Sequence, residues 1–246
     1  MIISYIQGGL GNQLFQIAAG LSLARDIGCE FRLIRNQHHL PLQGTRIENY
    51  YNNIFKNIKF IEVEDVVNFK IYREPFFSFR EIPKIENLIL EGYFQSEKYF
   101  KHNENYIREV INFPKCETKP NFVSLHLRQG DYANNLKFHY IQKLDYYNQS
   151  VSLIKNYDKI LAFSDSKFPD EFNFDRLELV TRSNDLDEFS IMSSCQTNII
   201  SNSTFSWWAA WANQNKNKRV LAPRTWFGPE GPQDWQDIYC EGWEII

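Results

Sequence analysis

Short apolar runs alternate with helical patterns through the second half of the chain, and this alternation restricts the fold more than any other feature. The strand-like runs cover residues 122–127, 159–165, 177–181, 197–201 and 218–223, and the helical patterns cover residues 140–156, 185–195 and 203–215. Because strands that alternate with helices form βαβ units, the pattern predicts a parallel, doubly wound α/β sheet.

The N-terminus opens with the same kind of unit. Residues 2–6 (IISYI) indicate a strand, residues 7–11 (QGGLG) a glycine turn, and the helical spacing that begins at Asn12 ends at Gly28. A second strand is predicted at 30–35. The order strand, glycine loop, helix, strand is typical of a parallel α/β sheet.

The middle of the chain is less regular. Residues 37–79 show no sustained period, so no element is predicted there. A strand that ends at Gly92 follows, and a helix is predicted near 96–110.

A chain of 246 residues is long enough for one large or two small domains. Residues 112–121 contain two prolines and no periodicity, which marks a domain boundary. We therefore predict an N-terminal Rossmann-like domain at 1–115 and a C-terminal Rossmann-like domain at 116–246.

Charge and composition exclude several classes of protein. A net charge of -3, from 27 basic and 30 acidic residues, gives no electrostatic footprint for nucleic acid or an anionic membrane. No apolar run approaches the roughly 18 residues of a membrane span, and the N-terminus lacks the features of a leader. The cysteines are widely spaced and form no Cys-x-x-Cys pair, which favours reduced thiols. We expect a cytoplasmic protein.

In doubly wound sheets, ligands bind just beyond the carboxyl ends of the strands. The alternation of residues 123–128 places His126 and Arg128 on one face, so both can project from the end of the same strand. The guanidinium of Arg128 suits a phosphate. A lone His is more often structural, but its combination with Arg and Asp favours function. Asp131 is either a base or a salt-bridge partner that orients Arg128, and the second role is the simpler one.

Three other clusters carry weaker signals. Gly8-Gly9-x-Gly11, followed by Asn12 and Gln13, allows a ligand to approach the backbone, but a tight turn explains the glycines equally well. Asp165 ends a predicted strand and either binds a ribose hydroxyl or base edge or closes a turn. Ser203 and Thr204 begin a predicted helix, where hydroxyls and amides grip a phosphate or form an ordinary N-cap.

Six motifs in order resemble the bacterial α-1,2-fucosyltransferases, whose glycosyltransferase family includes the animal blood-group H enzymes. They are GGLGNQLFQIAAG, LEGYFQSEKYF, VSLHLRQGDY, FSDS, NIISNSTFSWWAAW and VLAPRTWF. The resemblance runs from Gly8 to Phe227 and leaves 36–85 largely uncovered. It implies a GT-B-like α/β fold of two Rossmann-like, doubly wound domains that face a cleft.

The resemblance also implies an activity. The donor would be GDP-β-L-fucose, the acceptor the 2-hydroxyl of a terminal galactose in an oligosaccharide, and the reaction would invert the anomeric centre without a metal ion or another cofactor. The product would be an α-1,2 linkage in a surface glycan. Residues 185–187 have Asp-x-Asp spacing but fall at the predicted start of a helix. No transmembrane segment is expected, while peripheral membrane association and the oligomeric state stay open.

The resemblance assigns roles to individual residues. Arg128 would contact the β-phosphate, His126 the guanine side and Asp187 the guanine. Asp131 is the candidate catalytic base because of its position near the end of the predicted strand, not because of the resemblance. The other donor-binding residues are the diphosphate contacts Ser203, Thr204 and Phe205, the loop residues Gly9, Gly11 and Asn12 of the other domain, and Asp165. The family usually shows His-x-Arg-Arg, whereas Gln129 stands at the second arginine here. Loss of this guanidinium predicts a slower enzyme or one that relies on Arg128 alone.

Three alternatives remain. A nicotinamide-dependent oxidoreductase is disfavoured, because the glycine loop lacks the third fingerprint glycine and Arg32 or Arg35, not an acidic residue, ends the second strand. A non-catalytic glycan-binding module would use the aromatic side chains. Another nucleotide-sugar-dependent glycosyltransferase would keep the donor site and change the sugar.

Overall fold

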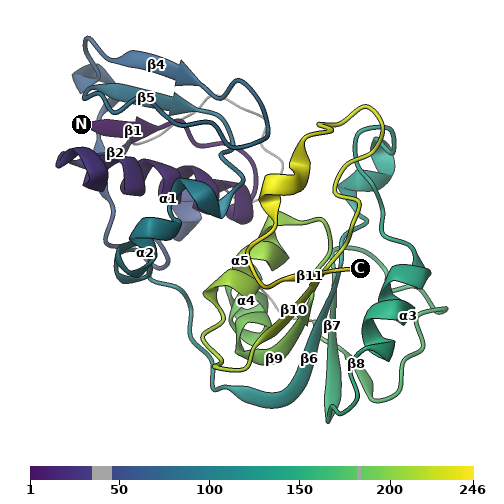
Figure 1. The fold of residues 1–246 in the computed structure, drawn as a ribbon. Coiled ribbons are helices and arrows are strands. Elements are labelled where there is room, and N and C mark those ends of the chain that lie inside the picture. Colours follow the sequence, from purple (N-terminus) through teal and green to yellow (C-terminus); the bar gives the residue numbers. More distant parts are fainter. Residues whose placement is uncertain (35–45, 182–183) are drawn as a thin grey trace. The chain divides into compact units, whose positions relative to one another are not determined.

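The computed structural model describes residues 1–34, 46–181 and 184–246, and it divides into two compact α/β units (Figure 1). The N-terminal unit contains Met1–Phe113 and Asp234–Cys240, and the C-terminal unit contains Pro114–Gln233 and Glu241–Ile246. Each unit has a parallel sheet with helices packed against it, which confirms the predicted α/β, GT-B-like fold class. None of the helices in the described residues is long and apolar enough to cross a membrane.

The sheet of the N-terminal unit has five parallel strands in the order β3-β2-β1-β5-β4. The strands are β1 (Ile2–Ser4), β2 (Phe31–Ile34), β3 (Lys59–Ile61), β4 (Lys70–Arg73) and β5 (Leu88–Glu91). The helices are α1 (Leu10–Ile27) and α2 (Glu104–Val110), with 3-10 turns η1 (Ile47–Tyr50), η2 (Val63–Asp65), η3 (Glu97–Tyr99), η4 (Lys101–Asn103) and η6 (Trp235–Ile238). The helix predicted near 96–110 is therefore divided into two 3-10 turns and α2.

Helix α1 packs closely against β1 and β2. A Cβ added to Gly20 would lie 2.3 Å from the Phe31 ring and 2.6 Å from the Ser4 hydroxyl, so the helix approaches the sheet where glycine permits it. Gly28 ends the helix in the left-handed region (φ 71°), and its N–H bonds back to the last turn. The predicted stop at Gly28 is confirmed.

One C-terminal segment belongs to the N-terminal unit. The carboxylates of Asp234 and Asp237 accept hydrogen bonds from the backbone N–H groups of Ser78 (2.8 Å) and Phe79 (2.9 Å), and Asp237 also pairs with Lys98. These contacts attach residues 234–240 to the first sheet. The sequence-based division assigned this segment to the C-terminal domain, because composition alone does not show a chain that returns.

The sheet of the C-terminal unit has six parallel strands in the order β11-β10-β9-β6-β7-β8. The strands are β6 (Lys119–Leu127), β7 (Lys159–Ser164), β8 (Leu177–Leu179), β9 (Cys195–Ile199), β10 (Arg219–Ala222) and β11 (Glu244–Ile245). The helices are α3 (Leu144–Ser152), α4 (Asp185–Ser194) and α5 (Thr204–Ala212), and η5 (Asp131–Asn134) is a 3-10 turn. Strands β7 and β8 extend the sheet to one side of β6, and β9, β10 and β11 extend it to the other.

This strand order determines where a ligand binds. The winding reverses between β6 and β9, and in doubly wound sheets the binding crevice opens at that point, beyond the carboxyl ends of the strands. Val123, Leu125 and Leu127 of β6 lie in the hydrophobic core, as the alternation predicts. Ser124 and His126 lie on the opposite face of β6 and are also buried, and His126 is one residue from the carboxyl end of the strand.

Candidate functional site

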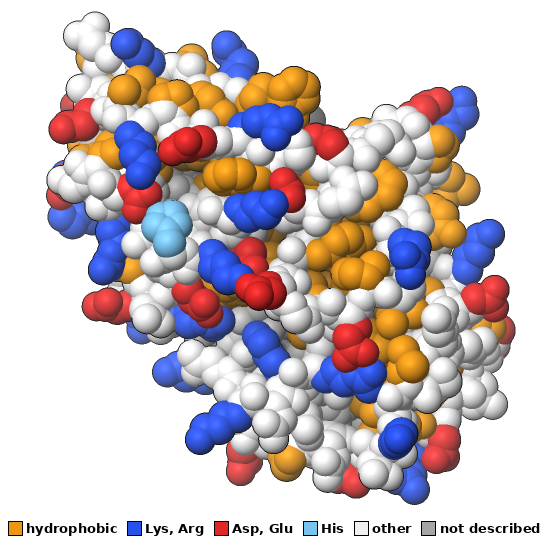
Figure 2. Space-filling view, in the orientation of Figure 1, with side chains coloured by type: hydrophobic (Ala, Val, Ile, Leu, Met, Phe, Trp, Pro, Cys, Tyr) orange, Lys and Arg blue, Asp and Glu red, His pale blue; other side chains and the backbone are white. Residues whose placement is uncertain are grey.

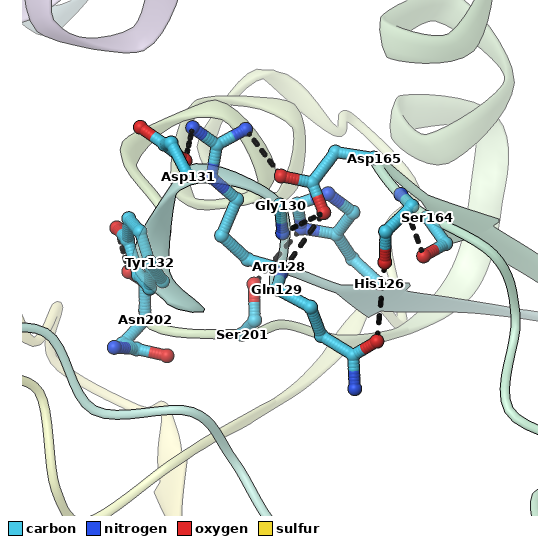
Figure 3. Close-up of polar contacts among 11 residues, drawn as sticks. His126, Arg128, Gln129, Gly130, Asp131, Tyr132, Ser164, Asp165, Ser201 and Asn202 are labelled. Carbon is cyan, nitrogen blue, oxygen red and sulfur yellow. Dashed lines mark hydrogen bonds and ion pairs between the residues drawn. The ribbon is translucent and has the colours of Figure 1, made fainter. Parts of the chain in front are cut away.

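Arg128 lies between two carboxylates directly beyond the end of β6 (Figure 3). Its Nη2 donates to Asp131 Oδ1 at 2.5 Å, and its Nη1 lies 2.8 Å from Asp165 Oδ2. The sheet explains the second contact. Leu127 of β6 is paired with Ser164 of β7, so the residues that follow them, Arg128 and Asp165, are neighbours. Register therefore brings together two side chains that are far apart in the sequence.

Asp165 is bonded to the turn that follows Arg128. Its Oδ1 accepts hydrogen bonds from the backbone N–H groups of Gln129 (2.9 Å) and Gly130 (3.1 Å). A Cβ on Gly130 would lie 2.7 Å from Asp165 Oδ2, so glycine is what allows the turn to approach the carboxylate. Ser166 adds a bond from its hydroxyl to the Gln129 amide oxygen (3.2 Å). The predicted contact between Asp165 and a nucleotide stays a prediction.

His126 is buried beside the start of α5. Only 7% of its surface is exposed, its Nδ1 is hydrogen bonded to the Ser201 hydroxyl (2.9 Å), and its ring centroid lies 6.1 Å from that of Phe205. Burial lowers the pKa of His126 to about 4, so the imidazole is neutral at pH 7. A neutral imidazole forms directional hydrogen bonds, which suits the edge of a base better than the charge of a phosphate.

The chain between β9 and α5 supplies the other side of the site. Asn202 is buried at 2% exposure, and its side chain donates to the carbonyls of Tyr140 (2.7 Å) and Trp226 (2.8 Å). Ser203 is the N-cap residue of α5 by its backbone conformation, but its hydroxyl makes no capping bond to the helix. Thr204 and Phe205 follow in the first turn, where helix N–H groups attract anions.

Two residues of this site were not identified from the sequence. The hydroxyl of Tyr132 donates to the Asn202 carbonyl (2.9 Å), and its ring lies 5.2 Å from the Arg128 guanidinium carbon. The same ring stacks on His139, with centroids 4.1 Å apart. Burial raises the pKa of Tyr132 to about 12, so its hydroxyl stays protonated and can donate. Tyr132 follows Asp131 directly and could have been identified, whereas nothing in the sequence indicates His139.

Asp187 lies in the first turn of α4. It is exposed, and it forms reciprocal hydrogen bonds with the N-cap residue Asn184, each 2.9 Å long. The predicted position of the Asp-x-Asp spacing at a helix start is confirmed. Within residues 1–34, 46–181 and 184–246, no group of three or more His, Cys, Asp or Glu side chains is arranged to hold a metal ion.

Gly9, Gly11 and Asn12 lie in the N-terminal unit, at the carboxyl end of β1. The N-cap of α1 is Gly9 rather than Asn12, so α1 begins earlier than predicted. Asn12 Oδ1 accepts a hydrogen bond from Gln95 (3.0 Å). Gln13 is buried, and its side-chain amide donates to the Gly8 carbonyl (2.9 Å).

On the face that Figure 2 shows, basic and acidic side chains are interspersed. This matches the near balance of 27 basic and 30 acidic residues. An anionic ligand must therefore be bound by local geometry, which in the C-terminal unit means Arg128 and the first turn of α5.

Comparisons with known proteins agree on the family. The model of glycosyl transferase family 11 matches residues 1–246. The O-antigen biosynthesis glycosyltransferase WbnK of Escherichia coli is 27% identical, and the match covers 91% of this chain and 94% of WbnK. An alpha-1,2-colitosyltransferase of Escherichia coli is also 27% identical, and the match covers 94% of this chain and 93% of that protein.

Among solved structures, the fucosyltransferase NodZ from Bradyrhizobium is 15% identical with a TM-score of 0.47, and the match covers 85% of this chain and 91% of NodZ. The family model covers the whole chain, and it confirms the resemblance that the six motifs indicated. The chain belongs to glycosyl transferase family 11.

Proposed function

We propose that this glycosyltransferase moves L-fucose from GDP-β-L-fucose to the 2-hydroxyl of a terminal galactose, forming an α-1,2 linkage in a surface glycan. The observation that carries the proposal is the position of Arg128, which presents a guanidinium at the carboxyl end of β6, where the winding of the sheet reverses. Similarity to an alpha-1,2-colitosyltransferase supports an α-1,2 linkage, and similarity to an O-antigen biosynthesis glycosyltransferase supports a surface-glycan product.

The chemistry requires stabilisation of a leaving diphosphate. The acceptor oxygen forms a bond to the anomeric carbon while the bond from that carbon to the β-phosphate oxygen breaks, and the electron pair leaves with GDP. The acceptor proton passes to a base, for which Asp131 is the candidate. Negative charge grows on the diphosphate, so donors that are already oriented there lower the barrier. Arg128 and the first-turn amides of α5 are such donors.

Gln129 removes one positively charged hydrogen-bond donor from the site of the leaving diphosphate. Where the related motif has a second arginine, the neutral Gln129 side chain accepts a hydrogen bond from Ser166 instead. The leaving group then depends on Arg128 and the helix terminus, and we expect a lower turnover number than for members with both arginines.

The colitosyltransferase similarity favours a second donor. Colitose is fucose without the 3-hydroxyl, so one GDP-binding site accommodates either sugar. The test is to incubate the protein with GDP-fucose, GDP-colitose or GDP-mannose and a panel of galactose-terminated oligosaccharides, then to determine mass and linkage. We expect transfer of fucose to the galactose 2-hydroxyl, with or without EDTA. Preference for GDP-colitose would replace the donor assignment, and transfer from none of the three would exclude the proposal.

A thermal-shift panel separates the other classes. Stabilisation by GDP and not by NAD is expected of the glycosyltransferase, while the reverse result would indicate an oxidoreductase. A glycan-binding module would bind oligosaccharides whether or not GDP is present, and its binding would survive Arg128→Ala.

A further inference from the structure

We propose that the two carboxylates on Arg128 have opposite roles: Asp165 holds the guanidinium in place, whereas Asp131 occupies the edge that a diphosphate takes and has to leave before the donor binds. This inference rests on the proposed function, since it takes the ligand of Arg128 to be a nucleoside diphosphate. It describes which side chains contact Arg128 before the donor binds.

The charges around Arg128 oppose the binding of a diphosphate. One guanidinium lies against two carboxylates, so the cluster has one negative charge in excess. His126 is neutral at pH 7 and contributes no positive charge. A diphosphate that approaches this cluster is repelled, and both Nη atoms of Arg128 already have partners (Figure 3). Each Nη atom also has a second N–H, but the repulsion stays, so we expect one carboxylate to move away when a diphosphate binds to both Nη atoms.

Asp165 is the carboxylate that stays. It accepts from the backbone N–H groups of Gln129 and Gly130 in addition to its ion pair with Arg128. A Cβ on Gly130 would lie 2.7 Å from Asp165 Oδ2, so glycine permits the close approach between the turn and this carboxylate. If Asp165 moved away, it would lose two backbone hydrogen bonds as well as its ion pair, three interactions against the one that Asp131 makes with Arg128.

Asp131 is the carboxylate that can exchange. It begins the short 3-10 turn η5, and the hydrogen bond that its carboxylate makes is the one with Arg128 Nη2 (2.5 Å). Its side chain is 30% exposed, so water can solvate the carboxylate after it leaves. A phosphate oxygen then takes its place on the same guanidinium edge, with the geometry that arginine offers to either anion.

The two roles predict opposite effects on affinity. Isothermal titration of the full chain with GDP, and separately with inorganic pyrophosphate, compares the wild type with Asp131→Asn and Asp165→Asn. Removal of the competing charge in Asp131→Asn should tighten both ligands by about 3- to 10-fold. Loss of the brace in Asp165→Asn should weaken both by about 10-fold or more. Asp170→Asn removes the same charge from a 94% exposed side chain of this unit and should change neither affinity more than about 2-fold.

Tighter binding cannot result from a misfolded variant, so Asp131→Asn is the decisive arm. Unchanged or weaker binding of both ligands by Asp131→Asn, in a protein whose wild type binds GDP, would overturn the inference and leave the proposed function standing. Failure of the wild type to bind either ligand would overturn both. A crystal structure of the GDP complex gives a second measure: Asp165 should remain on Arg128 and Asp131 should not, and retention of both contacts would overturn the exchange.

Discussion

At the scale of single residues, the central feature is Arg128, which follows directly after the end of β6. A guanidinium has five N–H donors in a planar fork, and in this structure Nη1 contacts Asp165 and Nη2 contacts Asp131. Its side chain is 31% exposed beyond the end of β6, so the fold depends little on it.

Arg128→Lys keeps the charge and removes the planar fork, so it separates the two contributions. We expect turnover to fall about 10- to 100-fold for Arg128→Lys and about 100- to 1,000-fold for Arg128→Ala, as for loss of other donors to a leaving group. The melting temperature of both should stay within a few degrees of the wild type. Steady-state kinetics and thermal melts check this; equal turnover in all three proteins would remove Arg128 from the mechanism.

The buried His126 predicts a pH dependence of stability. Its folded pKa is about 4, below an unfolded value near 6.5, so the unfolded chain binds more protons between these pH values. The folded state is therefore destabilised as pH falls from 6.5 towards 4, by up to about 3 kcal/mol. Denaturant unfolding from pH 4.5 to 7 should show this slope. His126→Asn should flatten it, and an identical slope in the variant would contradict the buried neutral imidazole.

At the scale of elements, strongly patterned segments were predicted well and short ones were not. The sequence predicted β6, β7, β9, α4 and α5 within a few residues, because their apolar periods are sustained. It missed β3 and β4, which have three and four residues; β4 has mostly exposed side chains and thus no alternation to detect. The helix predicted near 96–110 is interrupted because Phe100 adopts a non-helical conformation between η3 and η4.

The turn between β6 and η5 predicts an effect on activity more than on stability. A Cβ in Gly130→Ala meets the Asp165 carboxylate at 2.7 Å, so the turn or the carboxylate must move and Arg128 loses its orientation. We expect turnover to fall by about 10-fold or more, with a stability loss of about 1 kcal/mol. Ala133→Ser, an equally small change at an exposed residue of the same turn, should leave turnover within about 2-fold. Wild-type turnover of Gly130→Ala would contradict this tight approach.

At the scale of the whole molecule, the chain passes between the two units more than once. Residues 234–240 return to the N-terminal unit, and their carboxylates satisfy the backbone N–H groups of Ser78 and Phe79. A segment held in this way stabilises the loop that it contacts.

Replacing both Asp234 and Asp237 by Ala removes these acceptors and the partner of Lys98. The free energy of unfolding should fall by about 3 kcal/mol, the lower end for two lost hydrogen bonds to charged acceptors at about 1.5–3 kcal/mol each, because both bonds are only partly buried. Limited proteolysis should then cut near residues 75–80 sooner than in the wild type. Conversely, unaltered cleavage and stability would show that the returning segment does not hold this loop.

The sequence by itself determined the α/β class, the order of the strongly periodic elements and the family, and it predicted Arg128 as a site residue, because these depend on local period and on motifs. Only the tertiary structure decided what surrounds Arg128. Asp165 lies 37 positions further along the chain, and it reaches Arg128 through the pairing of β6 with β7, a register that no local pattern encodes. The proposed competition between Asp131 and a diphosphate for Arg128 also depends on the tertiary structure. The excess negative charge arises only when strand pairing brings Asp165 to Arg128 and Asp131.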